Sequence, residues 1–331
     1  MTRVTASAPG KIILFGEHAV VYGQPALAVP VTQVQATATI TPREAKPEVR
    51  EPGRREDWIW IEARDINRRY RLSDASATDP LAAAIRLMFA RQAAPRPGAT
   101  SEPPTLPDPF SLSLHSAIPI ASGLGSGAAV CTATVRALSA YLNLPLSDAE
   151  VSALVYETEK LLHGTPSGID NTVIAYGQPV YFTRGQTPTP FKIARPFWLV
   201  IGDTGLPSPT RIAVGDVRRA YEKDPARYTA LFQAVGEITR QAYPLIEAGQ
   251  PDQLGPLMNR NQALLREIGV SCSALDHLVD GALGAGAQGA KLSGGGRGGN
   301  MIALVTPETA SKVAAALAAQ GAVRTIVTEV V

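Results

Sequence analysis

Three glycines at alternate positions precede an alanine-rich segment in the stretch PIASGLGSGAAV, residues 119–130. An ordered glycine costs more conformational entropy than any other residue, so three of them before a helix indicate that bare backbone is needed there. The free N–H groups and the dipole of a helix N-terminus bind phosphate and other anions. The stretch therefore predicts an anion site, for which a phosphate group is the usual ligand.

The same stretch also matches the dinucleotide-binding pattern G-x-G-x-x-A, at Gly123, Gly125 and Ala128. A Rossmann unit needs a continuously apolar parallel strand directly before its glycine loop. Here the preceding segment FSLSLHS, residues 110–116, alternates apolar and polar residues, and Pro119 separates it from the loop. A dinucleotide site is therefore disfavoured, while a glycine loop that serves only helix packing stays open as an alternative.

A second glycine run, LSGGGRGGN, covers residues 292–300. So much glycine is incompatible with the interior of a stable helix or strand. The run lies between the strand-like segments GAKL and MIALV, which favours a loop close to a ligand over a flexible linker. The chain contains no G-x-x-x-x-G-K-[ST] sequence and no protein-kinase signature, so P-loop and protein-kinase chemistry are excluded.

Ionisable residues gather near these glycine runs in the sequence. Lys11 opens an apolar strand that ends at Glu17 and His18, and Asp170 lies in the loop-like segment HGTPSGIDN. Glu159 falls in the last turn of the preceding predicted helix, where its negative charge opposes the macrodipole and a metal cation would compensate it. Taken singly, Lys11 and Glu159 are both typical surface residues, so a functional role for either is indicated only by its occurrence together with the other ionisable residues.

Composition sets the limits of the interpretation. A chain of 331 residues exceeds one typical domain and predicts two. A net charge of +2 is too small to indicate nucleic acid or an anionic membrane as a partner. The two cysteines, Cys131 and Cys272, lack metal-ligand spacing, which predicts reduced thiols and a cytoplasmic protein. The charged N-terminus, with Lys11 and Glu17, does not fit a signal peptide.

Hydrophobic periodicity predicts the elements that position these residues. Strands are expected at 11–15, 25–40, 58–63, 69–73 and 110–116, and helices at 79–92 and 126–142. A capping box at 147–150 opens a helix that ends at 163–164, and the loop TPSGID follows. The segments 41–57 and 93–109 are expected to be an exposed hairpin tip and a proline-rich loop. A strand at 197–201 begins a second alternating region, which ends in a strand at 323–331, with the boundary between the regions at 185–195.

Four motifs in this order and spacing resemble those of the GHMP small-molecule kinases. They are PGKIILFGEHAVVYGQPA, PIASGLGSGAA, HGTPSGIDN and KLSGGGRGGN. The segments GDTGLPSPTR and MNRNQALLREIGVSCSALDHLV agree as well, so the resemblance covers most of the chain outside the two loops. Within the family, GEHAVVYGQPA and HGTPSGIDN are most similar to the members that act on mevalonate.

The resemblance implies an α/β (α+β) fold of two domains. A mixed-sheet, ATP-binding N-terminal domain is expected over residues 1–188 and a ferredoxin-like C-terminal domain over residues 189–331. The implied reaction is ATP-dependent phosphorylation of the 5-hydroxyl of mevalonate to 5-phosphomevalonate, a step of isoprenoid precursor synthesis. Relatives also suggest a homodimer.

The resemblance further implies roles for individual residues, in a reaction that depends on positioning and charge neutralisation. Asp170 orients, or also deprotonates, the attacking hydroxyl, and Lys11 neutralises charge near the transferred group. Mg²⁺ is held by Glu159 and Ser126. The ATP phosphates lie on a loop formed by Pro119, Gly123, Leu124, Gly125, Ser126, Gly127 and Ala128. The substrate is contacted by Glu17, His18, Thr210, Gly294, Gly295 and Gly296.

Two positions depart from the family pattern. Gly127 stands where the family has the serine associated with the metal, so Ser126 or a water would take over that contact. Arg297 stands where a glycine is expected, either as a solvated loop residue or as an added phosphate contact.

Two other functions stay open. One is a sibling kinase that phosphorylates the 3-hydroxyl of mevalonate or a sugar. The other is a non-catalytic regulator that binds ATP or a metabolite on the same scaffold. The presence of Lys11, Glu159 and Asp170 together argues against the regulator, because a sensor would not need all three.

Overall fold

The computed structural model describes residues 2–331 except 44–54, 95–107, 121, 165 and 209. Within these residues, the first sheet has seven strands in the order β4-β3-β5-β2-β6-β7, with β1 also paired to β2. Strands β3 and β5 run parallel and the other neighbours antiparallel, so the sheet is mixed. Its strands are β1 (Val4–Phe15), β2 (Ala26–Pro42), β3 (Trp60–Ala63), β4 (Arg68–Arg71), β5 (Phe110–Ser116), β6 (Val180–Phe182) and β7 (Thr189–Pro190).

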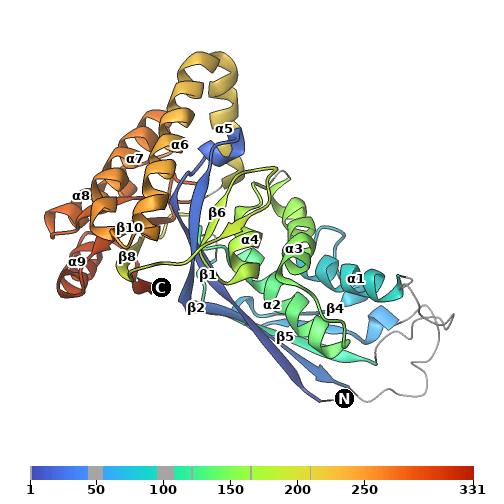
Figure 1. The fold of residues 1–331 in the computed structure, drawn as a ribbon. Helices are drawn as coiled ribbons and strands as arrows, with labels where there is room; N and C mark the ends of the chain where they lie inside the picture. The colour runs from blue at the N-terminus through green and yellow to red at the C-terminus, as the bar shows by residue number, and fades with distance from the viewer. Residues whose placement is uncertain (1, 44–54, 95–107, 121, 165, 209) are drawn as a thin grey trace.

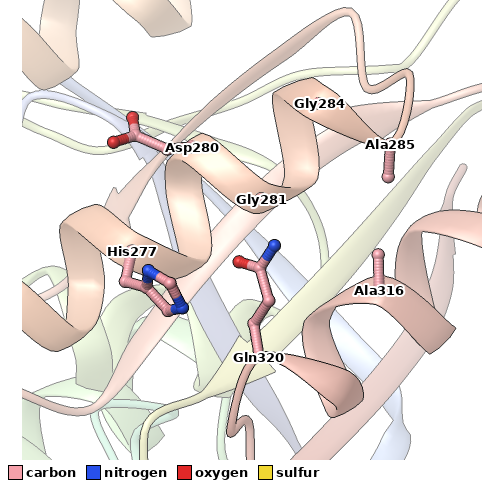
Figure 2. A pocket seen from close by; sticks show the side chains of 7 residues that line it. All are labelled: His277, Asp280, Gly281, Gly284, Ala285, Ala316 and Gln320. Atoms are coloured by element: carbon pink, nitrogen blue, oxygen red, sulfur yellow. The ribbon is translucent and has the colours of Figure 1, made fainter.

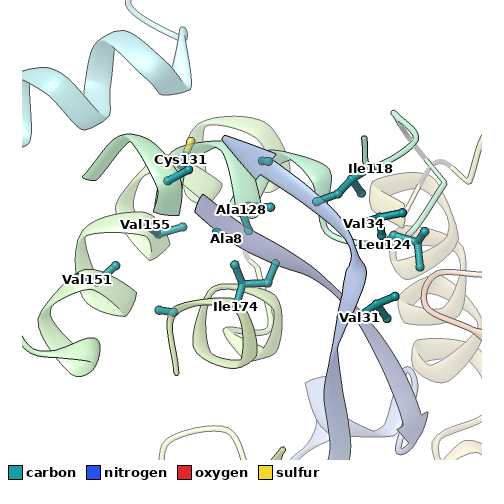
Figure 3. Close-up of a cluster of buried hydrophobic side chains, with 14 of the residues drawn as sticks. Ala8, Val31, Val34, Ile118, Leu124, Ala128, Cys131, Val151, Val155 and Ile174 are labelled. Carbon is teal, nitrogen blue, oxygen red and sulfur yellow. The ribbon is translucent and has the colours of Figure 1, made fainter. Parts of the chain in front are cut away.

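Buried and more exposed side chains alternate along these strands, and helices cover the face that carries the buried ones. Ile40, Ile61 and Leu112 point to one face and are fully buried. That face packs against helices, which lie together on one side of the sheet in Figure 1. Helices α2 (Ser126–Tyr141) and α4 (Ile169–Tyr176) contact the strands, and α1 (Pro80–Ala93) and α3 (Asp148–His163) pack on α2. Figure 3 shows part of this core, where Ala128 and Cys131 of α2 lie among side chains of the strands and of α3 and α4.

A second, smaller sheet forms the other half of the molecule. Its described strands are antiparallel in the order β11-β8-β10-β9, and comprise β8 (Phe197–Asp203), β9 (Gly289–Ser293), β10 (Asn300–Val305) and β11 (Arg324–Val330). The accompanying helices are α5 (Thr210–Lys223), α6 (Pro225–Glu247), α7 (Leu254–Ile268), α8 (Ser273–Gly284) and α9 (Pro307–Ala319). Helices α7, α8 and α9 pack on this sheet, and α6 packs on α7 (Figure 1).

The two halves meet where β1 passes the end of β9. The Ser293 hydroxyl accepts a hydrogen bond from the Ile13 N–H and donates one to the Ile13 carbonyl, both at 3.0 Å. A further contact joins Thr328 of β11 to Gln33 of β2, at 2.6 Å. The first strand of the chain therefore holds the second sheet directly against the first.

The structure confirms the expected mixed α/β fold with a second, smaller sheet, and it confirms the capping box formed by Ser147 and Glu150. One local expectation is wrong. Residues 169–176 form the helix α4, although a loop was expected up to residue 170. Eight residues are too few to show a clear helical period in the sequence, and the glycines at both ends resemble a loop.

Some sequence-based expectations fall outside what the structure describes. Most of the segments 41–57 and 93–109 lies in the residues that are not described. The domain boundary at 188/189 stays a prediction, and the last strand of the first sheet, β7, covers Thr189–Pro190. No helix in the described part of the chain is both long and apolar enough to cross a membrane.

Candidate active site

A lysine and an aspartate from distant parts of the chain meet at the edge of the first sheet. The Lys11 ammonium lies 3.1 Å from an Asp170 carboxylate oxygen. A register shift between Pro9 and Gly10 interrupts the pairing of β1 with β2 immediately before Lys11, and such bulges re-aim the side chains that follow them. Lys11 is 3% exposed and Asp170 is 33% exposed, so the pair is buried on the lysine side and accessible on the carboxylate side.

Asp170 owes its position to the start of α4. Gly168 caps the helix with a φ of 92°, and Asp170 follows in the first turn. A carboxylate in the first turn is stabilised by the positive end of the helix dipole. Asp170 is therefore held by a helix and not by the loop that the sequence suggested.

Glu159 of α3 completes a group of three charges. Its side chain is almost fully buried, and its pKa is raised to about 7, chiefly because burial disfavours the charged form. The neighbouring Asp170 charge contributes to this rise in pKa, and the Lys11 charge offsets part of it. Glu159 is therefore not a surface residue, although that was the expectation for it when taken singly.

The first glycine loop lies directly beside Lys11. The Lys11 N–H donates to the Leu124 carbonyl at 2.9 Å. Gly125 caps α2 with a φ of 77°, and a β-carbon there would lie 2.8 Å from Ile174 and 3.0 Å from the Lys11 side chain. Only glycine fits this position, so the close approach of loop and lysine requires the bare backbone that the sequence indicated.

The second glycine loop, residues 294–299 between β9 and β10, lies against the first. A β-carbon on Gly294 would be 3.6 Å from the Gly123 carbonyl oxygen. The Asn300 amide donates to the Ser122 carbonyl at 2.5 Å, which fixes the far end of the same contact. The structure thus brings together the two glycine runs, which are about 170 residues apart in the chain.

Two predicted substrate residues contact the second glycine loop. The His18 Nε2 atom lies 3.0 Å from the Gly295 carbonyl oxygen. Since a carbonyl only accepts, Nε2 carries the hydrogen, and burial lowers the pKa of His18 to about 4, which keeps the ring neutral. On the other side of the loop, a β-carbon on Gly295 would lie 2.7 Å from the Thr210 hydroxyl oxygen.

Glu17, the neighbour of His18, is sealed inside the protein. It pairs with Lys291 of β9, and both side chains are fully buried. The Asn261 amide of α7 donates to the other carboxylate oxygen at 3.3 Å. Burial raises the pKa of Glu17 and lowers that of Lys291, and the contact between the two charges offsets part of each shift. The pair joins the turn after β1 to the strand that leads into the second glycine loop.

Sequence reasoning missed Lys291, although it lies inside a motif singled out for its glycines. The usable signal was a lysine in the middle of the apolar strand GAKLS, where only a paired charge is tolerated. It also missed Ser208, whose hydroxyl donates to the Gly296 carbonyl at 2.9 Å. No single-sequence signal distinguishes that serine from an ordinary loop residue.

A cavity of about 550 Å³ lies elsewhere, between α8 and α9 (Figure 2). Its lining residues are His277, Asp280, Gly281, Gly284, Ala285, Ala316 and Gln320. None of the predicted site residues is among them. The candidate site is therefore the meeting point of the two glycine loops and the Lys11–Asp170 pair.

Comparison with known proteins shows the family of the chain. The model for the GHMP kinases N terminal domain matches residues 82–178, and the model for the GHMP kinases C terminal domain matches residues 242–323. A mevalonate kinase from Thermococcus sibiricus is 38% identical, in an alignment that covers 96% of this chain and 94% of that protein. The chain belongs to the GHMP kinase family. A mevalonate kinase from Pyrococcus furiosus is 36% identical to this GHMP kinase, with the same coverage of both proteins.

Solved structures agree with this assignment. The L. major mevalonate kinase in complex with R-mevalonate superposes on this GHMP kinase with a TM-score of 0.78. The two are 27% identical, and the match covers 98% of this chain and 95% of that one. A Lactococcus lactis galactokinase, complexed with galactose, reaches a TM-score of 0.75 at 19% identity, which shows the shared fold alone. Membership of a kinase family implies ATP as the phosphoryl donor.

Proposed function

We propose that this GHMP kinase transfers the γ-phosphoryl group of ATP to the 5-hydroxyl of mevalonate. The observation that carries the proposal is the Lys11–Asp170 pair, 3.1 Å apart and open on the carboxylate side, beside the junction of two glycine loops. Support for mevalonate comes from relatives named mevalonate kinase, which are 36–38% identical over nearly the whole chain. Support also comes from the similarity to a mevalonate kinase with R-mevalonate bound.

In this proposal Asp170 accepts a hydrogen bond from the attacking hydroxyl, orients it toward the γ-phosphorus and takes its proton as the new P–O bond forms. The Lys11 ammonium holds the Asp170 carboxylate in place and stabilises the negative charge on the transferred phosphoryl oxygens. The exposed side of Asp170 gives the hydroxyl its access. ADP leaves with the electron pair of the broken bond.

The two glycine loops would bind the ATP phosphates and the alcohol. The N-terminus of α2 offers free N–H groups and the positive end of a helix dipole to the triphosphate, along the loop from Pro119 to Ala128. His18 and Thr210 contact Gly295 from either side, so they would position the alcohol substrate against the loop. Glu17 would contribute to the substrate pocket indirectly, because its ion pair with Lys291 fixes the turn that carries His18.

The residues present fit a magnesium ion. Within the described residues no cluster of three or more His, Cys, Asp or Glu side chains could hold a metal by itself. Mg²⁺ characteristically uses one or two carboxylates and completes its shell with water and substrate phosphates. The buried Glu159 carboxylate, next to Asp170, gains from a nearby cation because burial disfavours its charge. Glu159 and Ser126 would hold the ion, which when bound supplies neutralisation of the phosphate charges.

The product of the reaction tests the substrate directly. Purified protein is incubated with ATP, Mg²⁺ and R-mevalonate, and the phosphorylated oxygen is located by NMR. We expect the phosphate on the 5-hydroxyl. A phosphate on the 3-hydroxyl, or turnover of galactose in place of mevalonate, would assign the protein to a sibling kinase. ATP binding without turnover of any alcohol would indicate a regulator.

Asp170→Asn tests the role of the carboxylate. An amide keeps the size of the side chain but removes the charge that binds Lys11 and accepts the proton, so we expect kcat to fall by about a thousandfold or more. ATP affinity, measured by calorimetry, should stay within about twofold of the original. Asp148→Asn, at a half-exposed aspartate that pairs with Arg136, is the matched control and should leave kcat unchanged. Near-normal turnover by Asp170→Asn would refute the mechanism.

Two further expectations accompany this function. A cytoplasmic location fits the cysteines Cys131 and Cys272, which are both unpaired in the structure. A homodimer is expected from the resemblance, and sedimentation of the purified protein tests it.

A further inference from the structure

Arg297 is the one non-glycine residue of the segment GGGRGG, residues 294–299. Its φ is 58°, in the left-handed region that glycine adopts without strain and other residues rarely adopt. A glycine would therefore be the easier residue at this position. A strained backbone conformation of this kind persists only where contacts with the surrounding structure hold the residue in it.

The contacts of Arg297 join the glycine loop to two other elements. Its guanidinium pairs with the Asp216 carboxylate of α5 and donates to the Gly269 carbonyl after α7, at 3.4 Å. Its backbone N–H donates to the Val270 carbonyl at 2.8 Å. Arg219 pairs with the same Asp216 from within α5. The hydrogen bond from Arg297 is also the main reason why the pKa of Asp216 is lowered.

The helix that Arg297 reaches carries a predicted substrate residue at its first position. Thr210 begins α5 and lies against Gly295, two residues before Arg297. Helix α5 buries only Ala213 and Val217 among its fourteen residues. Near its C-terminal end, Tyr221 also packs against Tyr22 and Phe232. The start of the helix has less apolar contact to hold it, so polar contacts such as Arg297–Asp216 contribute more to its position.

We propose that Arg297 is a positioning residue for the alcohol substrate, because its ion pair with Asp216 holds the start of α5, and with it Thr210, against the second glycine loop. This inference rests on the proposed function, since it deepens the account of the same site. It offers a third role beside the two alternatives that the sequence left open for Arg297. The guanidinium is 34% exposed, and a carboxylate and a carbonyl of its own chain hold it, which favours a positioning role over a freely solvated side chain or a phosphate contact.

The test compares Arg297→Ala, Asp216→Asn and the double variant with the unchanged protein. We expect each single change to raise the KM for mevalonate about fivefold, the scale of a partly exposed ion pair. The double variant should also show about fivefold, and not about twenty-fivefold, because both changes remove the same contact. The KM for ATP and kcat should stay within about twofold. Arg219→Ala, which removes the Asp216 partner that does not touch the loop, is the matched control and should leave every constant unchanged.

Three results would overturn the inference. A rise in the KM for ATP confined to Arg297→Ala would make the arginine a phosphate contact. Multiplicative effects in the double variant would show that the two residues act separately. A lower melting temperature with an unchanged KM for mevalonate would reduce the ion pair to a purely structural role.

Hydrogen exchange gives a readout that does not depend on the substrate. Amides of residues 210–216 should exchange faster in Arg297→Ala and Asp216→Asn than in Arg219→Ala. If the protein failed to phosphorylate mevalonate, the proposed function would fall while this measurement still tested the contact. Unchanged exchange in all three variants would overturn the inference even if mevalonate were the substrate.

Discussion

Two lysine–carboxylate pairs lie within a few residues of each other along β1 and the turn after it, and they differ in one respect. Lys11 meets Asp170 with the carboxylate 33% exposed, whereas Glu17 meets Lys291 with both side chains at 0%. The charges are the same in kind, and each pair joins segments far apart in the chain. Access therefore separates them, because only the first pair can meet a ligand without unfolding its surroundings.

The sealed pair shows what a buried charge does in a fold. Taking both ions out of water is costly, and their attraction repays this only when both partners are present. The pair connects the turn that carries His18 to the strand that enters the second glycine loop. Its contribution is to the geometry of the site, while the open pair is available for the reaction itself.

The strongest test of this contrast is Lys11→Met. Methionine keeps the buried volume but removes the ammonium beside Asp170 and Glu159, so we expect kcat to fall about ten-thousandfold, or about 5 kcal/mol. Steady-state kinetics measures the loss, and calorimetry should show that ATP still binds. Lys192→Met, at an exposed lysine, is the control and should leave kcat unchanged. Retained turnover in Lys11→Met would break the distinction between the two pairs.

Lys291→Met should affect stability before activity. It leaves the Glu17 carboxylate buried beside Asn261 without its cation, which should lower the free energy of unfolding by about 4 kcal/mol. Urea unfolding followed by circular dichroism measures the change. Adding Glu17→Gln removes the stranded charge and should recover part of the loss. If the single variant kept its stability but lost turnover, the sealed pair would be catalytic after all.

A smaller effect is expected from pH at His18. Its pKa is about 4 in the folded protein and 6.5 ordinarily. At a pH between these two values, His18 is protonated in the unfolded chain but neutral in the folded protein. Unfolding is therefore favoured as pH falls from about 6.5 to about 4, with a loss of roughly 3 kcal/mol from this group. His18→Asn, which tolerates the positive φ of 58°, should show a weaker acid destabilisation in urea titrations. An identical pH dependence in both proteins would contradict the buried, neutral histidine.

The sequence predicted what depends on local pattern and ordered motifs. Periodicity located most strands of the first half and the helices α1 and α2, the capping box at Ser147 marked the start of α3, and the motifs predicted that Lys11, Asp170 and the glycine loops share one site. The helices of the second half were expected only as an alternating pattern without bounds. The contacts that were missed join residues far apart in the chain. Glu17 and Lys291 are 274 positions apart, and Asp216 and Arg297 are 81 apart. The family motifs predicted one distant meeting, that of Lys11 with Asp170. For the pairs that were missed, packing of the two sheets decides which side chains face each other, and the sequence did not name the partners.

The contact between Gly123 and Gly294 makes the site a joint property of both halves of the molecule. The two loops belong to different sheets, and each packs against the other. A fragment ending between β7 and β8 would keep Lys11, Glu159 and Asp170 yet leave its glycine loop without the opposing loop of the second sheet. Reassociation of two complementary fragments, and neither fragment alone, would restore the contact between the two glycine loops.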